Sequence, residues 1–198
     1  MELIHYLNQH FLTREQLLAR CDLMPEQLQQ WQARRMMPRA SYRLRLDIVC
    51  DSFFGEHREQ LAAEYYAKAY LSWIGLVRPL GGEPEAFAVF ARRYRARLEQ
   101  LAASGFDVPD RLATDGHVAA EWEHFLDGTY GLCTVSGLPE DIAAKELAIA
   151  QIREAGGRAQ LRRCVDLLDA VSSPFAPHEV ARSSRHRYVD EMRRVHGL

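Results

Sequence analysis

The sequence predicts a mainly α protein in which a small N-terminal winged helix-turn-helix precedes an α-helical bundle. Three observations support this fold class. Two short amphipathic segments are joined by a tight turn between residues 13 and 38, charged and apolar residues alternate from Tyr42 to Ile48, and helical spacing of apolar residues dominates after residue 53. We therefore expect two domains, residues 1–52 and residues 53–198.

The expected helix pair carries its own start and stop signals. Thr13 and Gln16 have the spacing of a capping box, in which the side chain of each accepts a hydrogen bond from the backbone N–H of the other. Pro25 suits the first position of the second helix, because its fixed φ and missing N–H are tolerated there. Pro38 ends that helix, and the alternating segment after it would form the wing.

Side chains on the second helix and just after it are candidates for contact with DNA. Gln27, Gln30 and Arg34 lie at spacings of three and four on its expected exposed face, and such side chains read base edges in a major groove. Residues 34–45 contain five arginines and no acidic residue, a cluster that attracts phosphates. The predicted DNA contacts are therefore Gln27, Gln30, Arg34, Arg35, Arg39, Arg43 and Arg45.

A fixed order of residues spans the helix pair and the wing: Leu17-Leu18, Leu28, Trp31, Met36-Met37-Pro38 and Tyr42-Arg43. This order resembles the winged helix-turn-helix of the MerR and excisionase type, over about a quarter of the chain. The resemblance implies that the second helix docks in the major groove with the wing on the DNA backbone. The pattern departs at Met24-Pro25-Glu26, where Glu26 would face phosphate. A domain of this shape that docks on a protein is therefore an alternative.

After residue 56 the chain has the spacing of helices almost throughout. One expected helix covers Arg58–Val77 and places Tyr66, Tyr70 and Trp73 on one face. Further helices are expected over residues 84–103, 114–126 and 161–171, from residue 139 onward, and over residues 178–196. Five or six helices of this kind predict a helical bundle.

Composition and charge bound the function. No apolar run reaches the twenty or so residues that cross a bilayer, and the N-terminus lacks a basic segment followed by an apolar core, so we expect a cytoplasmic protein. The four cysteines lack the paired spacing of a disulfide framework or a zinc site, and we expect no cofactor. Residues 1–50 hold seven Lys and Arg against five Asp and Glu, while residues 51–198 hold eighteen against twenty-two. Any nucleic-acid contact must therefore be local.

One candidate metal site lies in the expected helix over residues 114–126. His117, Glu121 and His124 are spaced by four and three residues, which places two imidazoles and a carboxylate on one helical face. Three ligands from one short helix do not surround an ion, so a fourth would have to come from Asp127, Glu146 or His186. The alternative is a solvated or hydrogen-bonded face beside the core.

Five further residues are candidates for a ligand pocket. Tyr66, Tyr70 and Trp73 form an aromatic stripe that could line a pocket for a planar ligand, although such stripes more often belong to the core. In the segment 127–134, two glycines flank Tyr130, and Cys133 follows near the end. Glycines permit close approach of the backbone to a ligand, but buried Tyr130 and Cys133 beside a turn are the alternative.

Three short segments also resemble an uncharacterised bacterial family with a natural-product-biosynthesis label: EYYAKAYLSWIG, FLDGTYGLCT and SRHRYVDEMR. This resemblance implies no catalytic residues, and it raises the alternative of an enzyme or accessory factor of small-molecule biosynthesis. The first expectation is a DNA-binding transcriptional regulator whose helical domain dimerises or senses a small-molecule effector. Its expected partners are DNA, an effector and a second copy of the chain, and no membrane.

Overall fold

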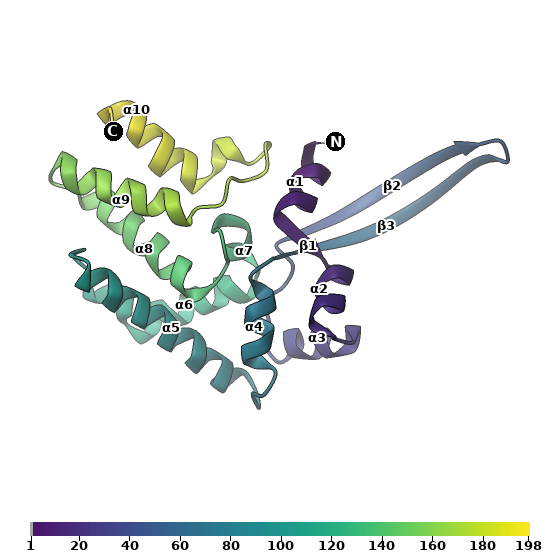
Figure 1. The fold of residues 1–198 in the computed structure, drawn as a ribbon, viewed down its shortest axis with the longest axis horizontal. Coiled ribbons are helices and arrows are strands. Elements are labelled where there is room, and N and C mark those ends of the chain that lie inside the picture. The colour runs from purple at the N-terminus through teal and green to yellow at the C-terminus, as the bar shows by residue number, and fades with distance from the viewer. Residues whose placement is uncertain (1) are drawn as a thin grey trace.

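A long antiparallel hairpin organises the N-terminal part of the protein. The computed structural model describes residues 2–198. Its first elements are α1 (Glu2–His10), β1 (Phe11–Thr13), α2 (Arg14–Cys21), α3 (Pro25–Ala33), β2 (Tyr42–Ser52) and β3 (Gly55–Ala67). The three strands form one antiparallel sheet in the order β1-β3-β2. Figure 1 shows that β2 and β3 project from one side of the molecule as a two-stranded ribbon.

The helix pair predicted from the sequence is confirmed as α2 and α3. The backbone N–H of Gln16 donates to the Thr13 hydroxyl oxygen at 3.3 Å, and the Thr13 N–H donates to the Gln16 side chain at 3.1 Å. Asp22, in the left-handed conformation, ends α2, and Pro25 occupies the first turn of α3. The two helices thus begin where the capping signals place them.

The helix predicted over Arg58–Val77 is wrong for its first twelve residues, because α4 (Tyr70–Val77) begins only at Tyr70. Residues 58–67 belong to β3 and pair with β2, from Val49↔Arg58 inward to Tyr42↔Tyr65. Glu, Gln, Leu and Ala in this segment favour a helix locally, but strand pairing overrides that preference. The domain boundary predicted after residue 52 falls at the ribbon tip, where Phe53 and Phe54 connect the paired Ser52 and Gly55.

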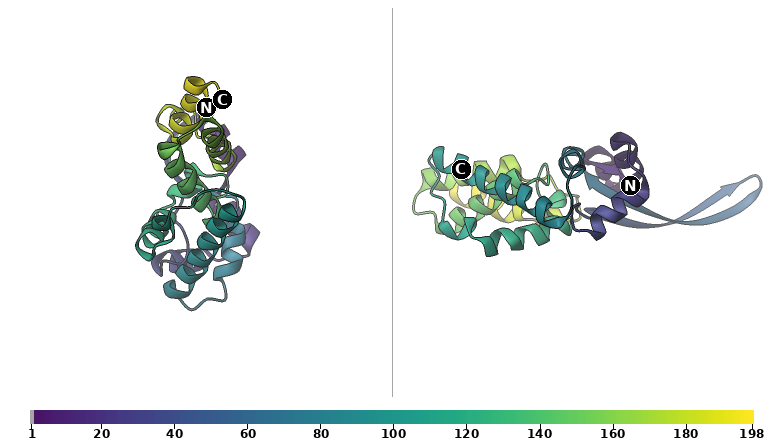
Figure 2. Two further views of the ribbon diagram at one scale, coloured as in Figure 1. Left: turned by 90° about the vertical axis from the view of Figure 1, so that its left-hand side faces the viewer. Right: turned by 90° about the horizontal axis from the view of Figure 1, so that it is seen from below.

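Most of the remaining chain is helical. The elements are α4 (Tyr70–Val77), α5 (Glu83–Ala103), η1 (Asp110–Ala113), α6 (Asp115–Leu126), α7 (Thr129–Cys133), α8 (Pro139–Glu154), α9 (Arg158–Val171), η2 (Val180–Arg182), the π-helical turn η3 (His186–Asp190) and α10 (Glu191–His196). Helix α8 packs against both α5 and α9 and is buried on most of its sides. Figures 1 and 2 show these helices gathered on the side of the molecule away from the ribbon tip.

One hydrophobic core joins the N-terminal helix pair to the helices that follow. Leu28 and Trp31 of α3 belong to the same buried cluster as Trp73 of α4 and Phe90 of α5. The Trp73 indole N–H donates to the Met36 carbonyl oxygen at 2.9 Å, which fixes the chain between α3 and β2 against α4. The core therefore extends across the position where the sequence predicted separate domains.

The fold is mixed α and β, with 62% helix and 15% strand. The prediction of a mainly α protein, built from a winged helix-turn-helix followed by a bundle, is therefore wrong. Its physical cause is the pairing of residues 55–67 with β2 and β1, which turns an expected helix into the central strand of a sheet. Among residues 2–198, no helix has both the length and the apolar character that a membrane crossing requires.

Candidate functional site

A pocket of about 450 Å³ opens in the helical part, between α6, α7, α8 and the C-terminal segment 182–188. Its walls combine apolar and charged side chains. The charged residues that line it are Lys145, Glu146, Arg153, Arg182 and Arg187, with His124 at one side. Helix α7 contributes Tyr130 and Cys133, so two of the five residues predicted to line a ligand pocket do so.

Four cationic side chains face this pocket without a carboxylate partner. Within residues 2–198, none of Lys145, Arg153, Arg182 and Arg187 forms an ion pair. Lys145 is only 6% exposed and lies over the Tyr130 ring, 5.8 Å from its centroid. Arg153 donates two hydrogen bonds to the Tyr188 hydroxyl, at 2.7 and 3.1 Å. The pocket is therefore lined by four cations against one carboxyl group, that of Glu146.

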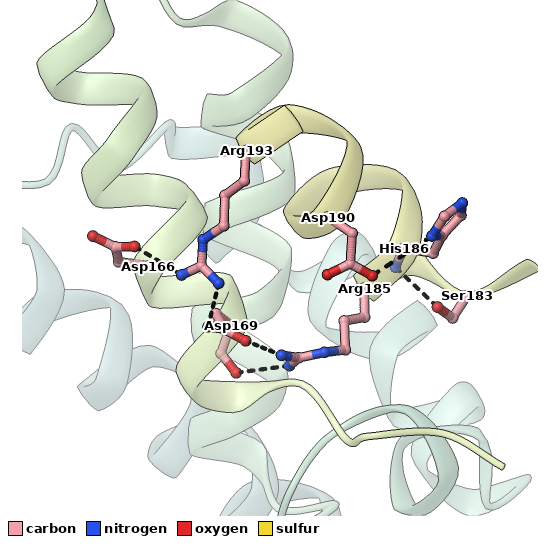
Figure 3. Close-up of polar contacts among 7 residues, drawn as sticks. All are labelled: Asp166, Asp169, Ser183, Arg185, His186, Asp190 and Arg193. Carbon is pink, nitrogen blue, oxygen red and sulfur yellow. Dashed lines mark hydrogen bonds and ion pairs between the residues drawn. The ribbon is translucent and has the colours of Figure 1, made fainter. Parts of the chain in front are cut away.

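The C-terminal segment is anchored by other arginines. Figure 3 shows Arg185 and Arg193 turned toward Asp169 of α9, with Asp166 on the outer side of Arg193. Arg193 pairs with Asp169 at 2.8 Å and with Asp166 at 3.0 Å. Burial alone would raise the Asp169 pKa, but hydrogen bonds and charge from Arg193 and Arg185 outweigh it, so this pKa lies below its usual value. These ion pairs fix the segment that carries Arg182 and Arg187.

At the pocket floor, the Tyr130 hydroxyl lies between two carboxyl groups. It contacts a side-chain oxygen of Glu121 and lies 3.2 Å from Glu146 Oε1. Burial raises the pKa of Glu146, and the nearby Glu121 carboxylate raises it further. A hydroxyl has one proton to donate, so both contacts are hydrogen bonds only if one carboxyl is protonated. The raised pKa favours the protonated form of Glu146 relative to an ordinary carboxyl group, and Tyr130 contacts Glu121 from the same hydroxyl.

Cys133 lies beside Lys145 but has the character of a buried thiol. Burial raises the pKa of Cys133, and the positive charge of Lys145 only partly opposes this effect. A raised pKa keeps the thiol protonated, and the thiolate is the reactive form. The geometry therefore favours a packing role for Cys133 over a nucleophilic one.

The structure does not bring the three metal candidates together. His117 Nε2 lies 3.1 Å from the Tyr94 hydroxyl and 3.6 Å from Glu121 Oε1, while His124 lies in the pocket wall. No group of three or more His, Cys, Asp or Glu side chains within residues 2–198 is arranged to hold a metal ion. Glu121 instead serves as a buried acceptor for Tyr130.

A family model matches residues 86–197, more than half of the chain, and it describes a family of unknown function, DUF6058. The chain belongs to this family. All residues that line the pocket lie inside the DUF6058 match, whereas the helix pair and the ribbon precede it. No curated protein and no solved structure matches the chain. The comparisons give no support to the MerR-type resemblance.

The predicted DNA contacts lie before the DUF6058 region and have unequal environments. Arg35 pairs with Glu83 at 2.7 Å and with Glu123, Arg39 pairs with Asp127 at 3.5 Å, and Arg43 lies 3.7 Å from Glu64. These three arginines are therefore engaged within the protein. Arg34 donates to the carbonyl oxygen of Gly81, a neutral partner. Gln27 accepts the N–H of Met24 at 3.0 Å, and Gln30 and Arg45 are exposed.

The aromatic stripe predicted to line a pocket lies in the core. Tyr66, Tyr70 and Trp73 are each at most 1% exposed and pack with the residues that join α3, α4 and α5. The Tyr66 hydroxyl donates to Glu64 at 2.9 Å and accepts from Gln32 at 3.2 Å. Those three residues therefore pack the core, and only Tyr130 and Cys133 of the set line the DUF6058 pocket.

Sequence reasoning missed Lys145 and Arg153 as pocket residues. Lys145, Ile149 and Arg153 recur every fourth residue along α8, so they share one face of that helix. Two cations on the face of a helix that is otherwise rich in Ala, Ile and Leu were a signal of a polar cavity. The convergence of Arg182 and Arg187 on the same cavity depends on the tertiary fold, and no spacing in the sequence encodes it.

Proposed function

We propose that this DUF6058 protein is a DNA-binding transcriptional regulator whose helical part binds a small anionic ligand. The observation that carries the proposal is the pocket of about 450 Å³ with four cations that have no carboxylate partner among the described residues. A cavity of this volume fits a metabolite with one or two phosphate or carboxylate groups. Arginine guanidinium groups match the geometry of both.

Burial strengthens the argument for an anion. Charged groups that are buried in proteins are normally paired, because an unpaired buried charge is costly. Lys145 is buried and lacks a carboxylate partner within residues 2–198, and the buried hydroxyl oxygen of Ser184 at the same pocket has no hydrogen-bond partner there either. A bound anion would accept a hydrogen bond from the Ser184 hydroxyl and would lie beside the positive charge of Lys145.

The DNA-binding half of the proposal rests on α3 and the base of the ribbon. Helix α3 follows α2 after a three-residue turn, and its exposed side carries Gln29 and Gln30. Arg34 and Arg45 are exposed and keep their charge, because neither pairs with a carboxylate among the described residues. We infer that Gln30 and Arg34 make the contacts, and that Arg35 does not.

Helix α7 physically connects the pocket with the N-terminal part of the protein that is proposed to bind DNA. Tyr130 and Cys133 of α7 line the pocket, while Gly131 lies against the Ser41 hydroxyl and the Tyr70 hydroxyl. Just before α7, the Leu126 carbonyl oxygen accepts the N–H of Arg39 at 2.8 Å. A shift of α7 on ligand binding would therefore displace the segment that leads into β2.

The pocket is tested by thermal melting with pyrophosphate as the probe. At about one hundred times its dissociation constant, a ligand stabilises the folded state by about 2.7 kcal/mol. For a chain of this length that corresponds to a rise in Tm of roughly 5–10 °C. We expect this rise in the wild-type protein and its loss in Arg182→Gln plus Arg187→Gln, which removes two of the four cations.

The matched control is Arg162→Gln plus Arg194→Gln. Both arginines are exposed, lie outside the pocket, and form no ion pair within residues 2–198. The control removes the same charge, so it should keep the wild-type response to pyrophosphate. An equal response in the pocket variant and the control variant would contradict the anion site.

A second candidate function, an enzyme or accessory factor of small-molecule biosynthesis, is favoured by Glu146. Burial and the nearby Glu121 raise the pKa of this carboxyl group at the pocket wall, where a general acid would be placed. Recovery of the bound anion unchanged after long incubation would favour the regulator. A product formed by the wild-type protein and absent from Glu146→Gln would favour the enzyme.

A further inference from the structure

The ribbon of β2 and β3 has a free edge. Strand β1 pairs only with residues Tyr65–Ala67 of β3, at the base of the ribbon. Strand β2 pairs with β3 on one side and has no strand on its other side within residues 2–198. Figures 1 and 2 show the ribbon extending away from every helix. From Asp47 to Ala62 all of its residues are exposed.

The two faces of the ribbon differ in polarity. Side chains alternate along a strand, and directly paired residues share a face. One face therefore carries an apolar set, namely Leu44, Leu46, Ile48, Leu61 and Ala63. The opposite face is polar, with Arg43 paired with Glu64 and Asp47 bonded to Gln60 at 2.8 Å. Ile48 is 40% exposed and Leu61 42% exposed, so the apolar face is open to solvent.

An isolated ribbon of this kind is an unstable arrangement in water. Two-stranded hairpins are marginally stable unless further strands or a helix cover them. An exposed strand edge is also a template for pairing with another chain. Strand β2 has neither a proline nor a lysine along its eleven residues, so it lacks two common devices that prevent edge pairing.

We propose that two copies of the chain pair through this edge, β2 against β2 and antiparallel, with Leu46 on the two-fold axis. Charge and the pairing of the apolar side chains together favour this register. With Leu46 opposite its own copy, Arg45 lies opposite Asp47 of the second copy, and this favourable pair occurs twice by symmetry. Leu44 then lies opposite Ile48 of the second copy, so the apolar faces join into one four-stranded surface.

Neighbouring registers are electrostatically worse. Centring the pairing on Asp47 places that carboxylate opposite itself, and centring it on Arg45 places two guanidinium groups together. Like charges directly opposite one another in a sheet are destabilising. The Leu46-centred pairing avoids both clashes, and it is independent of the proposed function.

The first test exchanges the two charges in the full chain. We expect the wild-type protein to sediment as a dimer at micromolar concentration, and Arg45→Asp or Asp47→Arg alone to raise the dimer dissociation constant at least ten-fold. The double variant Arg45→Asp plus Asp47→Arg restores opposite charges across the interface, so it should recover most of the dimer. A monomeric wild-type protein, or a double variant no better than either single variant, would overturn the proposal.

A cysteine test checks the register independently, in a Cys50→Ser background. Directly opposed residues in antiparallel strands have Cα atoms about 4.5–5.5 Å apart, a distance that a disulfide spans. Leu46→Cys should therefore form an interchain disulfide on mild oxidation. Ile48→Cys is the matched control. In the Leu46-centred pairing, position 48 of one copy lies four residues along the sheet from position 48 of the other copy, about 13 Å away. Equal cross-linking of both variants would contradict the register.

Discussion

At the scale of single residues, the hydrogen bonds at the pocket floor depend on the protonation of its carboxyl groups. One tyrosine hydroxyl, that of Tyr130, contacts two carboxyl groups, and both contacts are hydrogen bonds only when one of these groups holds a proton. The sequence predicted Tyr130 and Cys133 as pocket residues because glycines flank the tyrosine. It could not predict Glu146 in this role, because its raised pKa depends on burial beside Glu121, a residue of another helix.

Glu146→Gln tests this protonation. The folded-state pKa of Glu146 is raised, so the unfolded chain loses the proton at lower pH than the folded protein does, and stability falls as pH rises between the two pKa values. Glutamine is neutral at every pH and removes that loss. We therefore expect the Tm of the variant, relative to wild type, to increase from pH 4.5 to pH 7.5.

Glu99→Gln is the matched control for the pH series. Glu99 is exposed on α5 and forms no ion pair within residues 2–198, so its substitution should leave a constant Tm difference across the same pH range. A constant difference for Glu146→Gln as well would contradict a raised pKa of Glu146 in the folded protein.

At the scale of elements, helices with strong start signals were predictable and the sheet was not. Helices α5 and α8 begin within one residue of the predicted positions, where Pro84 and Pro139 occupy the first turn. Strand β3 was missed because Leu61 to Tyr66 satisfies helical and strand spacing equally well, and only pairing with β2 decides between them. Helix α7 was missed because its five residues are too few to show a period.

Two glycines test the placement of α7. A Cβ atom on Gly131 would lie 2.7 Å from the Tyr70 hydroxyl oxygen and also against the Ser41 hydroxyl, whereas a Cβ atom on Gly75 of α4 meets nothing within 4 Å. We expect Gly131→Ala to destabilise the fold by about 1–3 kcal/mol through overpacking. Gly75→Ala should stabilise it by about 0.5–1 kcal/mol, because alanine favours a helix.

Urea denaturation of the two variants measures both effects. A Gly131→Ala variant as stable as Gly75→Ala would show that α7 does not press against the segment before β2. The proposed connection between the pocket and the N-terminal part would then lose its physical basis.

At the scale of the whole molecule, the pocket and the helix pair share one protein body. The core runs from α3 through α4 to the helices of the DUF6058 region, so a ligand in the pocket and DNA on α3 would act on the same packed unit. Sequence periodicity identified most of the helices but implied two separate domains. It could not reveal the shared core, because Trp31, Trp73 and Phe90 belong to one buried cluster but lie far apart in the sequence.

The dissociation constant for DNA from upstream of the protein's own gene, measured with and without pyrophosphate, tests the central claim most directly. We expect the wild-type protein to prefer this DNA to competitor DNA, and Gln30→Glu to weaken binding about ten-fold, since one good base contact contributes about 1–3 kcal/mol. Gln160→Glu, an equal change at an exposed residue of α9, should leave the constant unchanged.

Pyrophosphate at matched ionic strength should change the wild-type constant about five-fold or more, the lower end of allosteric coupling. It should leave the constant of Arg182→Gln plus Arg187→Gln unchanged. The absence of any preference over competitor DNA, or the same effect of pyrophosphate on the wild-type protein and on the pocket variant, would contradict a regulator that responds to an anion in this pocket.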